Sequence, residues 1–253
     1  MRPITPFQHT RWFVRQPEYS HAPKRLFCFP YAGGSGTVYK KWQKFLPPSW
    51  ELVGIEPPGR ASRLMEPAHT SMDVLVKELI EEIAPLVNIP FAFFGHSNGA
   101  LVAFELTREL QRRGLPQPRI LMLSAKNPPH IERTEKIHDL PREAFLEKLR
   151  GYNGTPEALW SCDELMDLVL PSLRADFAIG ENYRYSSDIK PNVPVVLFAG
   201  RDDPYVEVDT LSEWRQYIHG KPNVITLNGD HFYFNTAHEP LLQNIKSLLN
   251  GLE

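Results

Sequence analysis

Short apolar segments alternate with helical patterns along most of the chain, and this alternation limits the possible folds more than any other feature. Strands are predicted at residues 12–14, 25–29, 51–55, 91–94, 119–124, 194–198 and 224–227. Helices are predicted at 39–46, 74–86, 100–110, 208–217 and 239–249. Apolar strands that alternate with helices favour a mostly parallel sheet covered by helices on both faces. The prediction is an α/β protein with one such central sheet.

The segment 126–190 interrupts this alternation. It is longer than the other connections, mostly helical in pattern, and rich in Arg, Glu and Leu. It joins the predicted strand at 119–124 to the one at 194–198, and ligands of open α/β sheets bind outside the carboxyl ends of the strands. We therefore predict a single domain, residues 1–253, in which the insertion at about 126–190 forms a helical lid over a ligand site.

Composition excludes several classes of protein. The chain has 253 residues, of which 42% are hydrophobic and 23% charged, enough for a sizeable core. A formal net charge of −2 gives no electrostatic reason to expect nucleic acid or a membrane surface as a partner. Cys28 and Cys162 are too few for a disulfide framework and lack metal-binding spacing. The chain shows no apolar leader and no membrane-length run, so we predict a cytoplasmic protein. We also predict a monomer that holds no metal.

A Gly-x-Ser-x-Gly pentapeptide, Gly95 to Gly99, follows the predicted strand at 91–94 and precedes the helix at 100–110. By composition alone the pattern should occur in about one such chain in twenty. A nucleophile elbow needs a strand before it, a helix after it and small flanking residues, because its serine lies in a strained turn. All three are present, so Ser97 is predicted to be a nucleophile rather than a serine in a structural turn. His96 is predicted to be structural.

In this kind of site an acid and then a histidine follow the serine along the chain. His231 lies in a tight loop directly after the strand at 224–227, at the edge of the sheet where a base could reach the serine. His219 and His238 are expected at the surface. His231 is therefore the predicted general base.

The acid is expected in the loop after the strand at 194–198, where Asp202 and Asp203 are both available. Asp203 precedes Pro204, which restricts the turn, whereas Asp202 could cap the loop or form a surface ion pair. Asp203 is the preferred partner of the histidine, with Asp202 as the alternative.

An oxyanion site needs two backbone N–H donors, one from the residue after the nucleophile and one from the loop after an early strand. Asn98 supplies the first. In the loop after residues 25–29, Ala32 supplies the second, next to glycines that let backbone approach a substrate. A phosphate loop at Gly33 to Gly36 is excluded because Thr37 stands where the Walker lysine would be, and a GxGxxG dinucleotide pattern is absent as well.

Together these segments resemble the type II thioesterases, the stand-alone editing hydrolases of nonribosomal peptide and polyketide synthases. The resemblance covers nearly the whole chain and rests on a series of blocks in order. These blocks are Trp12-Phe13, Leu26 to Ser35, Pro58-Gly59-Arg60, Gly95 to Ala100 with its Gly-His-Ser-x-Gly-Ala pattern, Gly200 to Val206, and Gly229-Asp230-His231-Phe232.

The resemblance implies an α/β-hydrolase fold with a helical lid and no cofactor. It also implies substrates held as thioesters on the phosphopantetheine arm of acyl or peptidyl carrier proteins. Ser97, Asp203 and His231 match the family's triad, and Ala32 and Asn98 match its oxyanion positions. One departure is that family members usually carry Met after the serine, where this chain has Asn98. The usual acyl preferences of the family therefore do not transfer directly.

Several alternatives stay open at this level. The chain could be an esterase or lipase acting on free esters, or a hydrolase-fold binding protein with little turnover. A thioesterase domain cut from a synthase is less favoured, because the chain starts at Met1 and shows no carrier-domain sequence. Arg60 and Arg63 could contact the pantetheine phosphate, but pairing with nearby carboxylates is favoured. Apolar lid residues such as Phe177 could line an acyl channel or pack within the lid.

Overall fold

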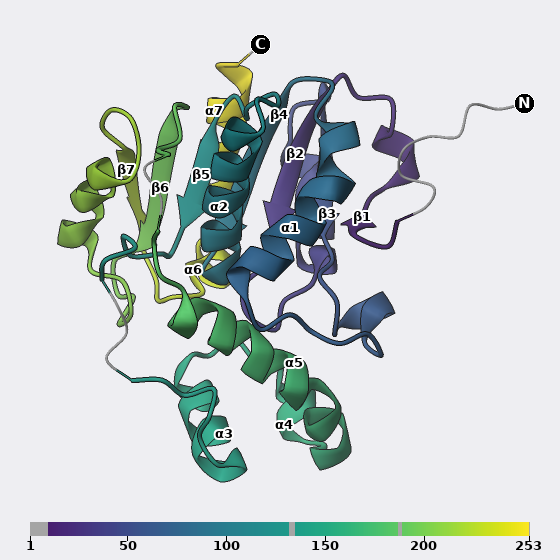
Figure 1. Cartoon of the computed structure of the whole chain (residues 1–253), viewed down its shortest axis with the longest axis vertical. Coiled ribbons are helices and arrows are strands. Elements are labelled where there is room, and N and C mark those ends of the chain that lie inside the picture. The colour runs from purple at the N-terminus through teal and green to yellow at the C-terminus, as the bar shows by residue number, and fades with distance from the viewer. Residues whose placement is uncertain (1–9, 132–134, 187–188, 253) are drawn as a thin grey trace, which may run out of the picture.

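The computed structural model describes residues 10–131, 135–186 and 189–252, and at its centre lies one seven-stranded sheet (Figure 1). Its strands are β1 (Phe13–Val14), β2 (Lys24–Phe29), β3 (Trp50–Ile55), β4 (Phe91–His96), β5 (Leu121–Ser124), β6 (Val195–Gly200) and β7 (Asn223–Leu227). They lie in the order β1-β3-β2-β4-β5-β6-β7, with only β1 antiparallel to its neighbour. The predicted mostly parallel α/β sheet is confirmed. The ends of the predicted domain, and residues 132–134 and 187–188 of the predicted lid, lie outside the described residues.

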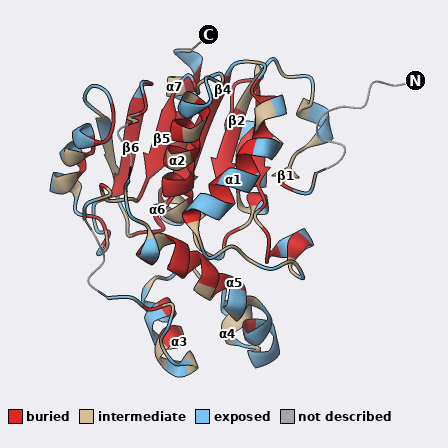
Figure 2. Ribbon diagram, viewed as in Figure 1, coloured by how far each residue is buried: buried red, intermediate tan, exposed pale blue. Residues whose placement is uncertain are grey.

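Helices cover both faces of this sheet. One face carries α1 (Met72–Ile83), α2 (Asn98–Arg112) and the 3-10 helix η5 (Val208–Gln216), and the other carries the 3-10 helix η2 (Gly36–Phe45), α6 (Tyr233–Thr236) and α7 (His238–Asn250). Short 3-10 turns lie at η1 (Pro17–Tyr19), η3 (Ala61–Arg63) and η4 (Ala84–Leu86). Along β2, Phe27 and Phe29 pack on the first face while Leu26 and Cys28 pack on the second. Because both faces of the central strands β2 to β6 are buried, these strands need nearly continuous apolar runs (Figure 2).

Two predicted helices are 3-10 helices in the structure, η2 and η5. Their apolar side chains recur at intervals of three, at Tyr39 and Trp42 in η2 and at Leu211 and Trp214 in η5, and all four are buried. A 3-10 helix has three residues per turn, so it places such side chains on one face. A spacing of three also occurs on one face of an α-helix, so the sequence did not distinguish the two helix types.

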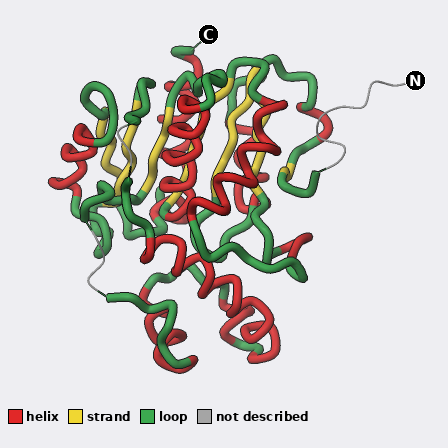
Figure 3. Tube along the Cα trace, in the orientation of Figure 1, coloured by secondary structure: helices red, strands yellow, loops and turns green. Residues whose placement is uncertain are grey.

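The lid contains α3 (Arg142–Gly151), α4 (Glu157–Trp160) and α5 (Asp163–Asn182), all within the predicted insertion. These helices project beyond the carboxyl ends of the strands (Figures 1 and 3). In α5, Leu165 and Leu168 are 45% and 47% exposed, whereas residues 175–179 after Pro171 are buried. The second half of α5 therefore packs against the rest of the molecule.

Candidate active site

Ser97 lies in the sharp turn between β4 and α2. Its φ of 55° and ψ of −116° are a strained conformation for a residue with a side chain. A Cβ added at Gly95 would overlap the backbone of Gly99, and one added at Gly99 would overlap the carbonyl of Phe29. Both glycines are needed because strand, turn and helix pass so close together. The serine thus has the strand–turn–helix setting that the sequence predicts.

A hydrogen-bonded chain joins the predicted serine, histidine and acid. His231 Nε2 lies 3.0 Å from Ser97 Oγ, and His231 Nδ1 lies 2.8 Å from Asp203 Oδ2. The other carboxylate oxygen, Oδ1, accepts the N–H of Tyr205 at 2.8 Å. His231 and Asp203 are buried, whereas Asp202 is exposed. Of the two candidate acids, the structure therefore brings Asp203 to the histidine and leaves Asp202 away from it.

The loops that carry the histidine and the acid are held against each other by backbone contacts. Asp202 N–H donates to Gly229 O at 3.0 Å, and Arg201 N–H donates to Leu227 O at 2.8 Å. A Cβ at Gly200 would overlap the carbonyl oxygens of residues 229 and 230, so only glycine permits this approach. The parallel strands β6 and β7 end at the same edge, and these contacts bring Asp203 within reach of His231.

Aromatic rings surround the His231 imidazole. The ring centroids of Phe232 and Tyr205 lie 5.3 and 5.6 Å from it, and that of Tyr152, from the lid, lies 6.3 Å away. Tyr152 also stacks on Tyr205 at 4.2 Å, so the lid meets the acid loop beside the histidine. These rings shield the histidine from water, which strengthens its electrostatic contacts. This role was not apparent from the sequence, although Phe232 is the direct neighbour of His231.

The oxyanion candidates, Ala32 and Asn98, line the same cavity as Ser97 and His231. Among the described residues, no hydrogen bond uses the backbone N–H of either residue. Ala32 occupies the second position of a turn in which Gly34 N–H donates to Tyr31 O at 2.9 Å. Two backbone donors are therefore available beside the serine, as an oxyanion site requires.

Comparison with known proteins places this geometry in a family. A family model described as a thioesterase domain matches residues 24–249. The chain belongs to the thioesterase family. The predictions of a thioesterase and of the α/β-hydrolase fold are confirmed.

Several similar proteins are named for biosynthetic pathways. The gramicidin S biosynthesis protein GrsT of Aneurinibacillus migulanus is 40% identical over 237 residues, which cover 93% of each chain. The linear gramicidin dehydrogenase LgrE of Brevibacillus parabrevis is 39% identical over 246 residues, covering 96% of this chain and 94% of LgrE. The solved structure of the type II thioesterase BorB, from the borrelidin biosynthetic cluster, has a TM-score of 0.83 and 32% identity over 93% of this chain and 96% of BorB.

The cavity of this thioesterase lies between its core and its lid. It has a volume of about 40 Å³, and Leu149, Tyr152, Leu173 and Phe177 of the lid line it opposite the serine. Three of these, Leu149, Leu173 and Phe177, also form part of the lid's own small apolar cluster. A second cavity of about 270 Å³ adjoins the first and shares Tyr31, Ala32 and Leu173 among its lining residues. The two interpretations of the lid side chains, packing and channel lining, therefore both apply.

His96 lies behind the nucleophile of the thioesterase and is fully buried. Its Nδ1 is 2.8 Å from Ser124 Oγ, and that hydroxyl also hydrogen-bonds the phenol of Tyr233. Burial, and secondarily the neighbouring His231, hold the pKa of His96 well below its ordinary value. An imidazole that stays neutral and bonded to Ser124 has the structural role predicted for it.

The two remaining downstream histidines lie outside the catalytic cavity, and one surface prediction is wrong. His219 is exposed, as expected, but His238 is half-buried and its ring centroid lies 5.4 Å from that of Phe45. His238 is the first residue of α7, and this helix packs on η2. The His238 ring therefore lies at the contact between the two helices.

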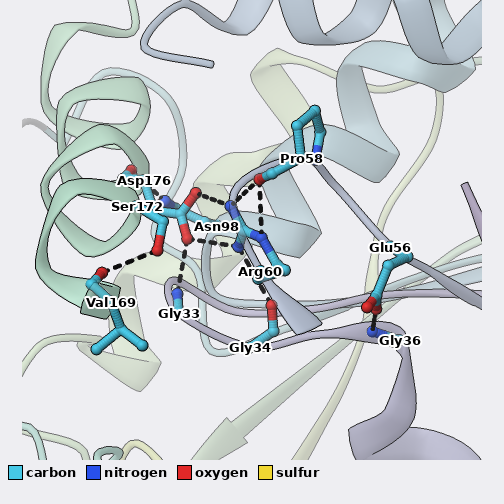
Figure 4. Close-up of polar contacts among 10 residues, drawn as sticks. All are labelled: Gly33, Gly34, Gly36, Glu56, Pro58, Arg60, Asn98, Val169, Ser172 and Asp176. Atoms are coloured by element: carbon cyan, nitrogen blue, oxygen red, sulfur yellow. Dashed lines mark hydrogen bonds and ion pairs between the residues drawn. The ribbon is translucent and has the colours of Figure 1, made fainter. Parts of the chain in front are cut away.

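The two arginines after the β3 turn pair with carboxylates. Arg63 donates to Glu66 at 2.6 and 2.8 Å, close in sequence as expected. Arg60 instead forms two bonds of 2.7 and 2.8 Å to Asp176 on α5, far away in sequence (Figure 4). Burial lowers the pKa of Arg60, but the charge and hydrogen bonds of Asp176 outweigh it and raise the pKa above its ordinary value. The structure supports pairing with carboxylates for both arginines.

Asp176 is a buried residue that the sequence analysis did not single out. A signal was present, because an acidic residue stands beside Phe177 on the apolar face of a predicted lid helix. The partner, Arg60, could not be inferred, since nothing local links residues so far apart.

No helix among the described residues is both long and apolar enough to cross a bilayer. Within the same ranges, no three His, Cys, Asp or Glu side chains gather where they could hold a metal ion.

Proposed function

We propose that this thioesterase hydrolyses acyl or aminoacyl thioesters on the phosphopantetheine arm of carrier proteins, and so unblocks a nonribosomal peptide or polyketide synthase. The observation that carries the proposal is the Ser97–His231–Asp203 chain beside two unused backbone donors. The names of two similar proteins, one a gramicidin S biosynthesis protein and one a type II thioesterase of the borrelidin cluster, support the synthase context.

In the first half of the reaction Ser97 Oγ attacks the thioester carbonyl carbon as His231 Nε2 takes the hydroxyl proton. Asp203 holds the imidazole through Nδ1 and stabilises the imidazolium that forms. The carbonyl oxygen becomes an oxyanion that accepts the N–H groups of Ala32 and Asn98. The C–S bond then breaks, the pantetheine thiolate receives the proton from His231, and an acyl ester remains on Ser97.

In the second half, water attacks the ester carbonyl while His231 Nε2 accepts a proton from that water. The same two backbone donors stabilise the second oxyanion. When the C–O bond breaks, His231 returns the proton to Ser97 Oγ, and the free acid leaves. The two steps together consume one water and need no cofactor or metal ion.

The cavity supports a short acyl group as substrate. Its volume of about 40 Å³ is much smaller than the roughly 270 Å³ of the adjoining cavity. A short acyl or aminoacyl group fits the space beside Ser97 better than a long fatty chain. The adjoining cavity of about 270 Å³ offers room for the rest of the substrate.

The site is complete within one chain, because the serine, histidine, acid and both donors belong to the same sheet edge. This supports action as a monomer. Cys28 and Cys162 are free thiols, which supports a reducing compartment such as the cytoplasm.

One similar protein is named a dehydrogenase, which would require a redox cofactor. The glycine loop after β2 lacks the dinucleotide pattern, and its glycines serve the turn next to Ala32. The hydrolase is therefore the function that the site supports, and incubation of the protein with NADPH and an acyl-loaded carrier should leave the 340 nm absorbance unchanged.

The decisive experiment offers the protein a panel of acyl- and aminoacyl-phosphopantetheinyl carrier domains and follows acyl release by intact mass. Ser97→Ala serves as the control. We expect release by the wild-type protein and none above background by the variant. Faster turnover of free p-nitrophenyl esters than of any carrier thioester would favour an esterase. Ligand binding without turnover in both proteins would favour a binding protein.

A further inference from the structure

A buried polar cluster connects the lid to both halves of the oxyanion site. At its centre is Asp176 of α5, which is 6% exposed, and its main partner Arg60 is 7% exposed (Figure 4). The Asp176 carboxylate accepts two bonds from Arg60 and a third from the backbone N–H of Gly33, where Gly33 N lies 2.7 Å from Oδ2. The backbone carbonyl of Asp176 accepts the side-chain amide of Asn98 at 2.5 Å.

The N–H that Asp176 accepts belongs to the turn that presents Ala32. Gly34 N–H closes this turn onto Tyr31 O, and Gly33 at its third position has φ of +76°. These are the features of a type II turn, whose central peptide joins the second and third residues. That central peptide, between Ala32 and Gly33, carries the N–H bonded to Asp176. The carboxylate therefore fixes the orientation of the peptide next to the Ala32 donor.

The rest of the cluster pairs this carboxylate with an opposite charge and holds it in place. A buried carboxylate is stable in its charged form only when it is paired and hydrogen-bonded. Arg60 supplies the opposite charge, and its other bonds, to the carbonyls of Pro58 and Gly34, tie it to the core. Asp176 is thus held by the core although it belongs to the lid.

One face of α5 contacts both donor-bearing segments of the oxyanion site. Leu173, Asp176 and Gly180 are spaced i, i+3 and i+7, which places them on one face of a helix. Leu173 packs so close to Gly33 that a Cβ there would overlap it, and the Asn98 side chain fills the space that a Cβ on Gly180 would need. The glycines at 33 and 180 therefore allow the helix to pack closely against both donor-bearing segments.

We propose that Asp176 is a positioning residue that holds the Ala32 N–H in place, so that the oxyanion site is complete only when α5 is seated on the core. This inference rests on the proposed thioester hydrolysis. It gives the lid a part in the chemical step, because withdrawal of α5 would release the turn around Ala32. Asp176 itself touches neither the substrate nor the reacting atoms.

The test compares Asp176→Ala and Asp176→Asn with the wild-type protein on an acetyl-loaded carrier domain. Loss of one oxyanion donor lowers kcat by about 10²–10³-fold, so Asp176→Ala should lose about 10²-fold in kcat. KM should stay within about 3-fold, because the donor acts on the transition state. In Asp176→Asn the amide oxygen still accepts from Gly33, so its kcat should fall less than that of the alanine variant.

Two pantetheine thioethers separate positioning from a general loss of structure. Ser97 Oγ attacks the ketone carbon of the trifluoroacetonyl thioether, and the ketone oxygen becomes an oxyanion. The S-propyl thioether has no carbonyl and binds without reacting. In Asp176→Ala the affinity for the first should fall by the same factor as kcat/KM, and the affinity for the second should not change. Equal losses for both ligands would overturn the proposal, as would wild-type kcat/KM in the folded variant.

Matched variants keep the test decisive. Asp167→Ala, also on α5, removes an exposed carboxylate that pairs with Arg142 of the lid, and should keep wild-type kcat. If Asp176→Ala does not fold, Arg60→Met combined with Asp176→Leu removes both buried charges and the Gly33 acceptor together. That double variant should show the same loss of kcat, and wild-type kcat in it would overturn the inference. Wild-type protein without thioesterase activity would instead contradict the proposed function.

Discussion

Asp203 and Asp176 are both buried carboxylates near the same serine, but they face partners of different kinds. Asp203 lies in the loop after β6 and bonds an imidazole, which gains and loses a proton during the proposed reaction. Asp176 lies on the lid helix and bonds a guanidinium, which keeps its charge throughout, and a backbone N–H. The first carboxylate can act on a proton transfer, whereas the second can act only on geometry. We expect substitution of Asp203 to lower kcat more than substitution of Asp176 does, because only Asp203 faces the group that takes up the proton.

The largest effect tests the acid that faces the imidazole. Asp203→Asn should lower kcat by about 10⁴-fold, because the amide favours the wrong imidazole tautomer and does not stabilise the imidazolium. Asp202→Asn is the matched control and should stay near wild-type, since Asp202 is exposed and away from His231. Steady-state kinetics on an acyl-loaded carrier measure both. A larger loss in Asp202→Asn than in Asp203→Asn would reverse the assignment of the acid.

The next prediction concerns the contribution of the Arg60–Asp176 ion pair to the free energy of unfolding. Arg60→Met leaves the Asp176 charge buried without its partner, and breaking such a pair costs about 3–5 kcal/mol of unfolding free energy. Arg60→Met combined with Asp176→Leu removes both charges and should recover most of that loss. Urea denaturation of the two variants gives the comparison. Equal stability of the single and double variants would show that the unpaired charge of Asp176 is not the cause of the destabilisation.

A third prediction concerns His96, the buried histidine behind the serine. Because burial holds the pKa of His96 below its ordinary value, the unfolded chain takes up this proton first as the pH falls through about 6.5. Acidification therefore stabilises the unfolded state, by at most about 1.4 kcal/mol per pH unit below that point. The contribution of His96 is fully present above pH 6.5 and is lost toward lower pH.

The measurement is urea denaturation at pH 8 and pH 5 of the wild-type protein and of His96→Asn. The variant lacks the titrating group, so its stability should fall less on acidification than that of the wild-type protein. Identical changes in the two proteins would mean that His96 does not contribute to the acid sensitivity.

The smallest effect distinguishes the backbone of Asn98 from its side chain. Asn98→Ala keeps the backbone N–H at the serine but removes the bond to the Asp176 carbonyl. Loss of one such hydrogen bond costs about 1 kcal/mol. We expect that decrease in unfolding free energy with kcat within about 10-fold of wild-type, well above that of Asp176→Ala. A loss of kcat equal to that of Asp176→Ala would assign the positioning role to the amide side chain instead.

The same comparison shows why one aspartate was predictable and the other was not. Asp203 follows a predicted strand and precedes a proline, and the order of serine, acid and histidine along the chain directs attention to it. Turn chemistry and strand periodicity are local, so Ser97 and His231 were located for the same reason. Asp176 and Arg60 are 116 residues apart, and no periodicity or turn rule links them. Their pairing depends on how α5 is seated, which is a property of the folded chain.

The apolar pattern predicted the positions of most strands and helices correctly, but not the type of two helices or the burial of His238. It located the strands, α1, α2 and α7, because buried faces demand a regular spacing of apolar side chains. It predicted ordinary helices where η2 and η5 are 3-10 helices, because a spacing of three, as at Tyr39 and Trp42, occurs in both helix types. It also placed His238 at the surface, because the packing of α7 on η2 is decided by tertiary contacts.

By itself the sequence determined the parallel α/β sheet, the strained serine turn and the order of the three residues that meet there. Those features follow from short-range rules: side-chain alternation, glycine where backbones approach, and loops at one edge of a parallel sheet. Only the tertiary structure decided which carboxylate pairs with Arg60, how the lid contacts the turn around Ala32, and how little space lies beside Ser97. Each of these depends on the close packing of α5 against distant segments, where a shift of one side chain changes which polar groups can meet.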